Sequence, residues 1–464
     1  MTASPTAPRF AREVRATAML AAPLVLGQLS AVLMTFVDTV LAGRHGATTL
    51  AAVAVGSAVW SVVILVLVGV LMAIPPSVSQ LNGGGRRGEI GPLYRQALWL
   101  ALALGLVLFV LVSLAAPLLA AMGIAAEVRP GAAAFLGAIR WGAPALALFF
   151  ASRYLSEGLA WTLPTMLFGI AGVLLLVPVG STLMFGYGPL PAMGAAGLGY
   201  ATALVLWLQA LGLLAYLHWS PRFVDLDLFS HWQPPHPREI AALLKLGLPI
   251  GVTVFLEGGL FVATALLIGT LGATAVASHQ VAINVASLAF MVPLGVAMAT
   301  TVRIGQAAGR GDGDGVRAAG RAGYAIVLGT QFVTASIMVF GRHTIAGVYT
   351  DDVGVAGLAA TLMLYAATFQ FPDGIQALSA GALRGLKDTT WPMAITALAY
   401  WGVGMPLGVI LGLHLGHGAP GMWVGLIVGL AIAATLLGWR FLRLARRAPM
   451  VEASRSPVAV TYDA

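Results

Sequence analysis

Long apolar runs separated by short polar loops follow one another along the whole chain. Each run is about twenty residues or longer, enough for one helix to cross the hydrocarbon core of a bilayer. The runs are too long and continuous for the alternating pattern of an outer-membrane barrel. The pattern therefore predicts an all-α integral membrane protein with twelve transmembrane helices, whose approximate limits are 16–41, 47–73, 92–117, 131–152, 164–186, 194–217, 241–269, 274–301, 316–340, 355–382, 391–413 and 418–441.

Composition narrows the class of protein further. Of the 464 residues, 59% are hydrophobic and only 9% are charged, whereas a soluble domain carries about 25% charged residues. The net charge of +8 comes from basic residues in the short loops, so it indicates membrane topology and gives no reason to expect nucleic acid. The chain has no cysteine, which excludes disulfides and thiolate metal sites. The first apolar run is too long for a signal peptide, so we expect it to be retained as the first span.

Basic residues are concentrated on one side of the predicted membrane. If the N-terminus is cytoplasmic, 21 of the 25 Arg and Lys residues, Arg153 and Arg384 among them, lie on the inner side. Loops rich in Arg and Lys face the cytoplasm, so both termini are predicted to be cytoplasmic. The exceptions are Arg44, Arg129 and Arg342 on the outer side and Arg140 inside a span.

The chain also repeats itself at a spacing of 226 residues. Without a gap, residues 23–95 align with 249–321, so that Pro23 meets Pro249 and "GAT" at 46–48 meets "GAT" at 272–274. Six spans plus six in the same orientation predict two lobes related by an axis along the membrane normal. The predicted divisions are an N-terminal tail 1–15, an N-lobe 16–217, a cytoplasmic linker 218–240 rich in proline, a C-lobe 241–441 and a C-terminal tail 442–464.

Three carboxylates lie inside predicted spans, where a charge is costly and usually functional. Glu257 is twelve residues beyond Lys245, or ~18 Å deep at the rise of a helix, and Asp373 is ~17 Å from its inner edge by the same rise. These two acids should share a depth near the midplane, whereas Asp38 belongs to the outer half of the first span. The 226-residue repeat duplicates none of the three, which favours chemistry over structure as the reason for them.

Polar and aromatic side chains accompany these acids. Phe369 and Gln376 fall on the helix face of Asp373, and Gln280, Asn284 and Ser287 share one face of the eighth span. Carboxylate and amide oxygens could hold a hard cation such as sodium at Glu257 and Asp373. The same carboxylates, desolvated in the membrane, could instead carry protons. A purely structural alternative is that one acid caps a helix pair by hydrogen bonding.

In several longer motifs the chain resembles multidrug and toxic compound extrusion (MATE) transporters, particularly the NorM-like bacterial branch. The resemblance rests on "FVDTVLAGRHGATTLAAVAVG", "GVLMAIPPSVSQLNGGGRR", "FLEGGLF", "SHQVAINVASLAFMVPLG" and "GALRGLKDTTWPMAITALAYWGVGMPLG", which occur in order over nearly the whole chain. It implies two six-helix lobes around a V-shaped central cleft in the bacterial inner membrane, and export of drugs in exchange for sodium or protons.

The resemblance also carries roles onto particular residues. It implies cation coupling at Glu257 and Asp373 and a coupling role for Asp38. The family's fifth span often reads Asn-x-Pro-x-Asn, but here Leu176 and Gly180 stand in the amide positions, which puts the polar surroundings of Asp38 in doubt.

Other functions fit the pattern less well. A lipid-linked oligosaccharide flippase is the main alternative, yet its anionic substrate would need several basic residues in the cleft, and the one candidate is Arg140. A proton-pumping respiratory subunit would need intramembrane lysines. No phosphate loop or nucleophile–base pair is evident, so we expect a transporter that is not an enzyme and that needs no cofactor beyond the coupling ion Na⁺ or H⁺. We expect its partners to be bulky organic cations of the small-molecule class and membrane lipid, and we expect it to be a monomer.

Overall fold

The computed structural model describes residues 9–121, 123–231 and 233–451, and these ranges are helical with no β-strand. Twelve helices or helix pairs within them are long and apolar enough to cross a membrane. The predicted all-α architecture with twelve spans is therefore confirmed. The described helices extend beyond several predicted limits, because α1 already begins at Arg9 and the last helix runs on to Val451.

The first half of the chain forms eight α-helices in six spans, because the second and third helices share one span and the fifth and sixth share another. The segments are α1 (Arg9–His45), α2 (Ala47–Leu71), α3 (Ile74–Gly83), α4 (Ile90–Leu118), α5 (Arg129–Ile139), α6 (Ala143–Gly158), α7 (Leu163–Phe185) and α8 (Gly194–Trp219), with short 3-10 turns at Arg87–Glu89, Arg140–Gly142 and Pro221–Leu226.

The second half forms four long helices followed by a span that is wound irregularly. The segments are α9 (Pro237–Gly269), α10 (Ala273–Gly309), α11 (Gly313–Tyr349), α12 (Val353–Gly385), α13 (Thr390–Ala397), α14 (Met405–Val409) and α15 (Gly418–Val451), with π-helical turns at Leu398–Gly404 and Ile410–His414.

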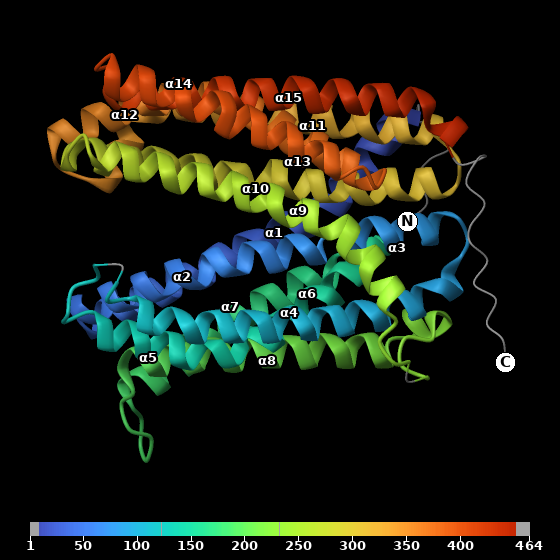
Figure 1. Cartoon of the computed structure of the whole chain (residues 1–464), viewed down its shortest axis with the longest axis horizontal. Coiled ribbons are helices and arrows are strands. Elements are labelled where there is room, and N and C mark those ends of the chain that lie inside the picture. The colour runs from blue at the N-terminus through green and yellow to red at the C-terminus, as the bar shows by residue number, and fades with distance from the viewer. Residues whose placement is uncertain (1–8, 122, 232, 452–464) are drawn as a thin grey trace.

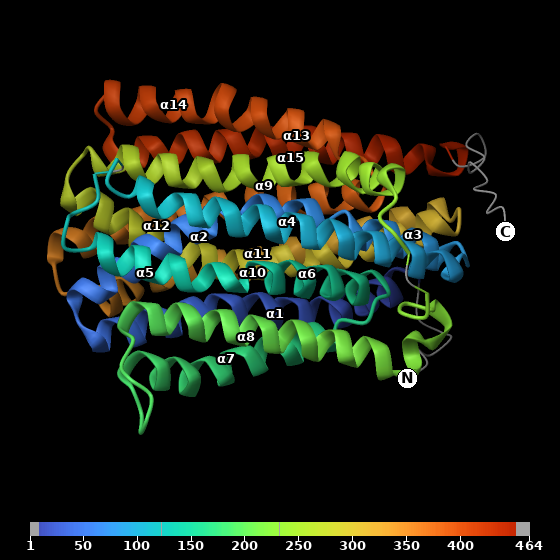
Figure 2. The ribbon, with the colours of Figure 1, turned by 60° about the horizontal axis from the view of Figure 1, so that its bottom comes forward.

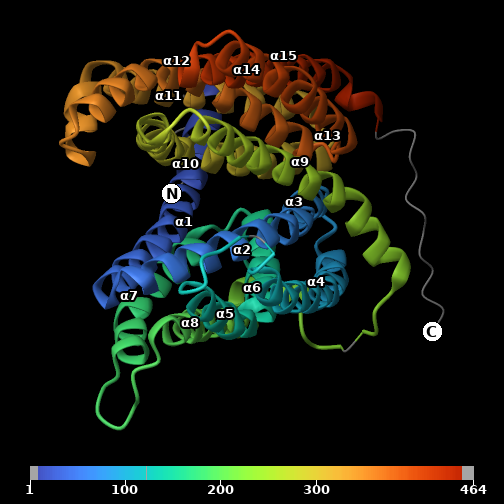
Figure 3. The same ribbon diagram turned by 60° about the vertical axis from the view of Figure 1, so that its left-hand side comes forward.

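The helices gather into two groups, with α2 to α8 in one and α10 to α15 in the other (Figures 1 and 3). Two helices run between the groups: α1 packs on α10 and α11, and α9 packs on α2. The 226-residue shift places α1 on α9 and α2 with α3 on α10, so these two contacts are equivalent. The break between α2 and α3 comes directly before Pro75 and Pro76, which cannot donate a backbone hydrogen bond.

The two groups converge at the end of the molecule that carries the N-terminus and diverge toward the other end (Figure 1). At the convergent end α3 meets α10 backbone to backbone. A Cβ atom added to Gly83 would lie 2.2 Å from the carbonyl oxygen of Gln306, so only glycine fits there. Gln80 Nε2 donates a hydrogen bond of 2.9 Å to the carbonyl of Gly385 in α12.

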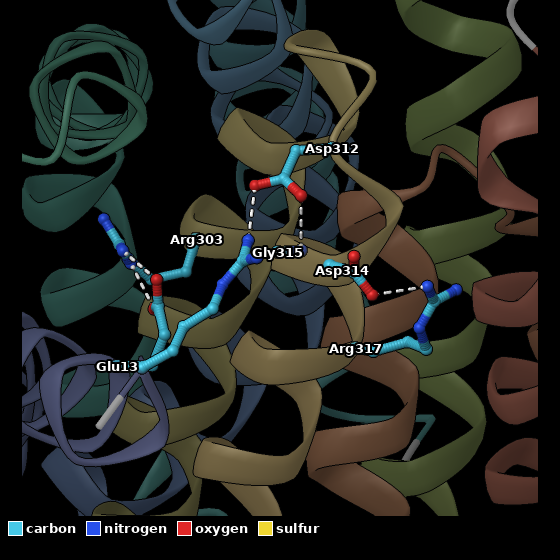
Figure 4. A network of polar contacts seen from close by, with 7 residues as sticks. Glu13, Arg303, Asp312, Asp314, Gly315 and Arg317 are labelled. Carbon is cyan, nitrogen blue, oxygen red and sulfur yellow. Dashed lines mark hydrogen bonds and ion pairs between the residues drawn. The ribbon is translucent and has the colours of Figure 1, made fainter.

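Ion pairs between distant parts of the chain also link the groups at this end (Figure 4). The guanidinium of Arg303 donates hydrogen bonds of 2.6 and 3.1 Å to both carboxylate oxygens of Glu13 in α1. Arg9 donates to Asp312 over 2.7 Å, and Asp312 also accepts from the amide of Gly315 and so caps α11. These contacts hold the first turns of α1 against the second half of the chain.

The segment between α8 and α9, which overlaps the predicted linker, lies against the start of α4 (Figure 2). Arg87 donates hydrogen bonds of 2.6 and 3.1 Å to Asp225, and these bonds lower the pKa of the Asp225 carboxyl below its ordinary value. Gln96 bridges the backbone of the same segment, donating to the carbonyl of Pro234 and accepting from the amide of His236. These hydrogen bonds hold the segment between α8 and α9 against the first half of the chain.

Candidate functional site

A cavity of about 410 Å³ lies between the two groups of helices. Its wall combines side chains from α1, α2 and α6 on one side with side chains from α9, α10 and α12 on the other. The lining is mostly apolar and aromatic, as is usual for a small-molecule site. The aromatic lining residues are Phe150, Tyr154, Phe261 and Phe290, and the polar ones include Gln28, Thr253, Glu257, Ser287, Gln376 and Arg384.

Glu257 and Asp373 are brought together at this cavity. Glu257 lies on α9, half-buried, and its side chain is part of the cavity wall. Asp373, on α12, is only 4% exposed, and its buried Oδ1 has no hydrogen-bond partner in the part of the chain that the structure describes. The two carboxylates lie near enough to repel each other when both are ionised. The expectation that these acids share a depth agrees with this arrangement.

Other predicted site residues divide between the cavity and its surroundings. Gln376 and Ser287 line the cavity, and the buried Oε1 of Gln376 has no partner. Phe369 lies behind the wall, with its ring centroid 5.9 Å from Phe261 and 5.5 Å from Trp423. Gln280 and Asn284 form a hydrogen bond of 3.0 Å to each other on an exposed face of α10 and do not line this cavity.

Asp38 lies apart from Glu257 and Asp373, in a pocket of side chains from α1, α7 and α8. It is 9% exposed, and the Thr202 hydroxyl is the one hydrogen-bond donor that the described residues offer it, at 3.5 Å. Leu176 is fully buried in an apolar cluster with Ala201 and Val205, and a Cβ atom at Gly180 would meet Leu41. Apolar packing therefore occupies the positions of the two asparagines that the resemblance led us to look for.

Sequence reasoning missed two polar residues of the site. The hydroxyl of Tyr400, on the first π-helical turn, is buried within electrostatic reach of Glu257 and Asp373, and no described residue forms a hydrogen bond with it. Arg384 is in the cavity wall, although its place two residues from a loop made it look like a cytoplasmic anchor. For Tyr400 a signal did exist, since it is a polar group inside an apolar span.

Two other arginines are also placed differently from expectation. Arg140, the candidate for an anionic cleft, contacts Phe109 and Trp141 and donates to Ser113, and it does not line the cavity. Arg153 is buried and donates to Glu157 over 2.6 Å, so it is not a loop residue facing the cytoplasm. Within the described residues the cavity wall holds one basic side chain, which argues against a polyanionic substrate.

Chemically, the site offers oxygen atoms to a cation. Among the described residues, Asp373 Oδ1, Gln376 Oε1 and the Tyr400 hydroxyl are buried without partners, and Gln376 shares the cavity wall with Glu257. A buried acceptor without a donor costs free energy, and a bound cation or a proton would remove that cost. The donor set of carboxylate, amide and hydroxyl oxygens suits a hard cation.

A protein-family model and individual known proteins match most of this chain. The model of the family described as MatE matches residues 23–182 and 249–410, which covers both halves of the repeat. The chain is 57% identical over 445 residues to the probable multidrug resistance protein NorM of Xanthomonas campestris pv. campestris, covering 96% of this chain and 97% of that one. It is 42% identical over 444 residues to the multidrug resistance protein PmpM of Pseudomonas aeruginosa, with coverage of 95% and 93%.

Solved structures show the same fold at low sequence identity. The eukaryotic MATE transporter AtDTX14 superposes with a TM-score of 0.85 at 18% identity, covering 95% of this chain and 99% of that one. A MATE family transporter of the MOP superfamily in an outward-facing conformation gives a TM-score of 0.86 at 18% identity, with coverage of 94% and 96%. The matching family model and the long, highly identical relatives show that this multi-pass membrane protein belongs to the MatE family.

Proposed function

We propose that the protein is a secondary antiporter that exports bulky organic cations and drugs in exchange for a coupling cation. The observation that carries this proposal is the cavity between the two helix groups, with Glu257 in its wall and Asp373 beside it. The names of the relatives, multidrug resistance proteins, support the same activity for this chain.

The two carboxylates allow exchange because a charge in a desolvated site needs a partner. A substrate cation bound near Glu257 and a coupling cation bound at Glu257 and Asp373 compete for the same negative charge. When neither cation is bound, the unpaired buried acids raise the free energy of the empty site. This disfavours the change between inward and outward conformations without a bound cation.

We propose sodium as the coupling ion, held by Glu257 and Asp373, with protons as the alternative. The unpartnered oxygens of Asp373 and Gln376 and the nearby Tyr400 hydroxyl support a metal cation, because a proton needs only one acceptor. Asp38 has lost the amide neighbours that would support a second site, so we assign it a modulating role.

We further propose that the chain lies in the bacterial inner membrane as a monomer with both termini in the cytoplasm. In that orientation the convergent end, with Glu13 and Arg303, is the cytoplasmic face, and the groups diverge toward the outside. The many basic residues near this end support the assignment.

Export can be tested in a bacterium that lacks its own drug pumps. Cells making the protein should accumulate less of a fluorescent organic cation such as ethidium, and dissipating the ion gradients should restore accumulation. Equal protection with and without gradients would rule out secondary antiport.

The coupling ion can be tested on purified protein. Adding sodium at constant pH should release a prebound organic cation and should also release protons from the carboxylates, while potassium should do much less. Asp38→Asn should weaken transport yet keep this sodium response. Release that follows pH alone, and that Asp38→Asn abolishes, would establish the proton alternative.

A further inference from the structure

Arg384 is the one basic side chain among the described residues of the cavity wall, and it forms an ion pair with none of their carboxylates. It lies in the last turn of α12, half-buried. Among the described residues its guanidinium donates a single hydrogen bond, to the sulfur of Met72 between α2 and α3 over 3.6 Å, and its Nε is buried with no partner. No acidic oxygen of the described residues lies within 4 Å of it, as the ion pairs of the protein show.

Most other shielded arginines of the described residues have a carboxylate partner. One exception is Arg140, whose Nε is also buried without a partner, but its guanidinium donates to Ser113 and lies outside the cavity. The side chains of Arg153, Arg303 and Arg440 are 5%, 23% and 24% exposed, and each is hydrogen-bonded to a carboxylate at 2.5 to 2.6 Å. A guanidinium has five N–H donors in a planar arrangement that fits a carboxylate or phosphate group with two bonds. A buried one without an acceptor is expensive, so Arg384 has unused capacity to bind an anion.

Glu257 supplies the opposite charge in the same wall. It is the one acidic residue among the described cavity-lining residues, and Arg384 is the one basic residue. The two side chains influence each other electrostatically but are too far apart to form an ion pair. Aromatic rings of Phe150, Phe261 and Phe290 form other parts of the wall.

We propose that Arg384 binds an anionic group of the substrate, a carboxylate above all, while Glu257 binds a cationic group of the same molecule. The cavity then recognises aromatic zwitterions as well as plain cations, and Arg384 is a residue that determines this specificity. The inference rests on the proposed function, because it takes the cavity to be the place where exported molecules bind.

The test uses a matched pair of dyes: a rhodamine with a free carboxylate, and the methyl ester of the same rhodamine. Fluorescence polarisation measures the binding of both dyes to the full-length protein in detergent. We expect Arg384→Gln to weaken binding of the carboxylate dye by about tenfold or more, the usual effect of losing a charge-assisted pair. The ester should bind the variant as well as the wild type or better, because a positive charge has been removed.

Two further variants keep the test informative if Arg384→Gln affects folding. Arg384→Lys retains the charge but not the two-bonded geometry, so it should restore part of the affinity for the carboxylate dye. Arg140→Gln removes an intramembrane arginine that does not line the cavity, and it should leave the ratio of the two affinities unchanged. The ratio is independent of the fraction of active protein.

The outcomes separate the two proposals. Equal loss of both dyes in Arg384→Gln, or no binding of the carboxylate dye by the wild type, would overturn the role of Arg384. If both dyes bind as expected but neither crosses the membrane against its gradient in proteoliposomes, the antiport function fails and the anion-binding role stands.

Discussion

Charged residues inside this protein are of two kinds, those that form an ion pair within the protein and those that do not. Arg153 and Glu157 are joined within the first half and are 5% and 1% exposed. Glu257 and Arg384 in the cavity wall and Asp373 behind it have no such partner among the described residues. Paired charges of this kind belong to the scaffold, whereas the unpaired ones are available to ions and substrates.

The acids of the cavity should be dispensable for folding but not for transport. Glu257→Gln and Asp373→Asn are near isosteric, so both variants should insert and purify like the wild type. Each should lose coupled efflux and bind an organic cation about tenfold more weakly or worse. Reconstituted transport checks this, with Asp351→Asn in an exposed loop as the control. Normal efflux by both variants would place the coupling site elsewhere.

The buried ion pair of Arg153 with Glu157, in contrast, should contribute to the stability of the fold. Glu157→Gln leaves the Arg153 guanidinium buried without a counter-charge, and it should lower the free energy of unfolding by about 3–5 kcal/mol. Unfolding in detergent measures this, and the exposed Glu127→Gln is the control. The double variant Arg153→Gln with Glu157→Gln should recover part of the loss, because no unpaired charge remains. A single variant as stable as the control would contradict the assignment.

At the scale of elements, hydropathy predicted the twelve spans well because each must be apolar over the thickness of a bilayer. It did not predict that α1 begins at Arg9. The polar first turns of this helix are stabilised by Arg303 and Asp312, some 300 residues away in the chain, and no local pattern records that. Arg384 was missed for a related reason, since only its contact with Met72, 312 residues away in the chain and between α2 and α3, shows where its side chain lies.

The segment between α8 and α9 offers a prediction at this scale. Arg87 lowers the pKa of Asp225, so the ion pair stabilises the docked segment above the ordinary Asp pKa of 3.8 and is lost as the pH falls through the lower folded value. Asp225→Asn should therefore speed hydrogen exchange in residues 220–231 at pH 7. The difference from the wild type, corrected for intrinsic rates, should shrink below about pH 3.8. A difference that grew on acidification would be inconsistent with this pair.

At the scale of the whole molecule, contact between the two helix groups at the convergent end depends on how closely the backbones of α3 and α10 can approach each other. A methyl group at Gly83 would collide with Gln306, and we expect Gly83→Ala to cost about 1–3 kcal/mol in the closed arrangement. The control is Gly88→Ala, where a Cβ meets nothing within 4 Å. Since the chain has no cysteine, spin labels at introduced Arg86→Cys and Arg310→Cys can report the separation. Longer distances in Gly83→Ala alone are expected, and identical distances in both variants would count against the contact.

The exchange of α1 and α9 between the helix groups has a consequence for how such a chain can be assembled. Each half of the repeat places its first helix against the other half, α1 on α10 and α9 on α2, while α1 also packs on α7 and α9 on α13 within their own halves, so each half covers part of the other's interior surface. These are the reciprocal contacts that two copies of one subunit make around a twofold axis. A half-length polypeptide with this pattern would need a twin, and joining the twins into one gene frees each to change separately. The acids and the arginine of the cavity all lie in the second half, so they are changes that one half has made without the other.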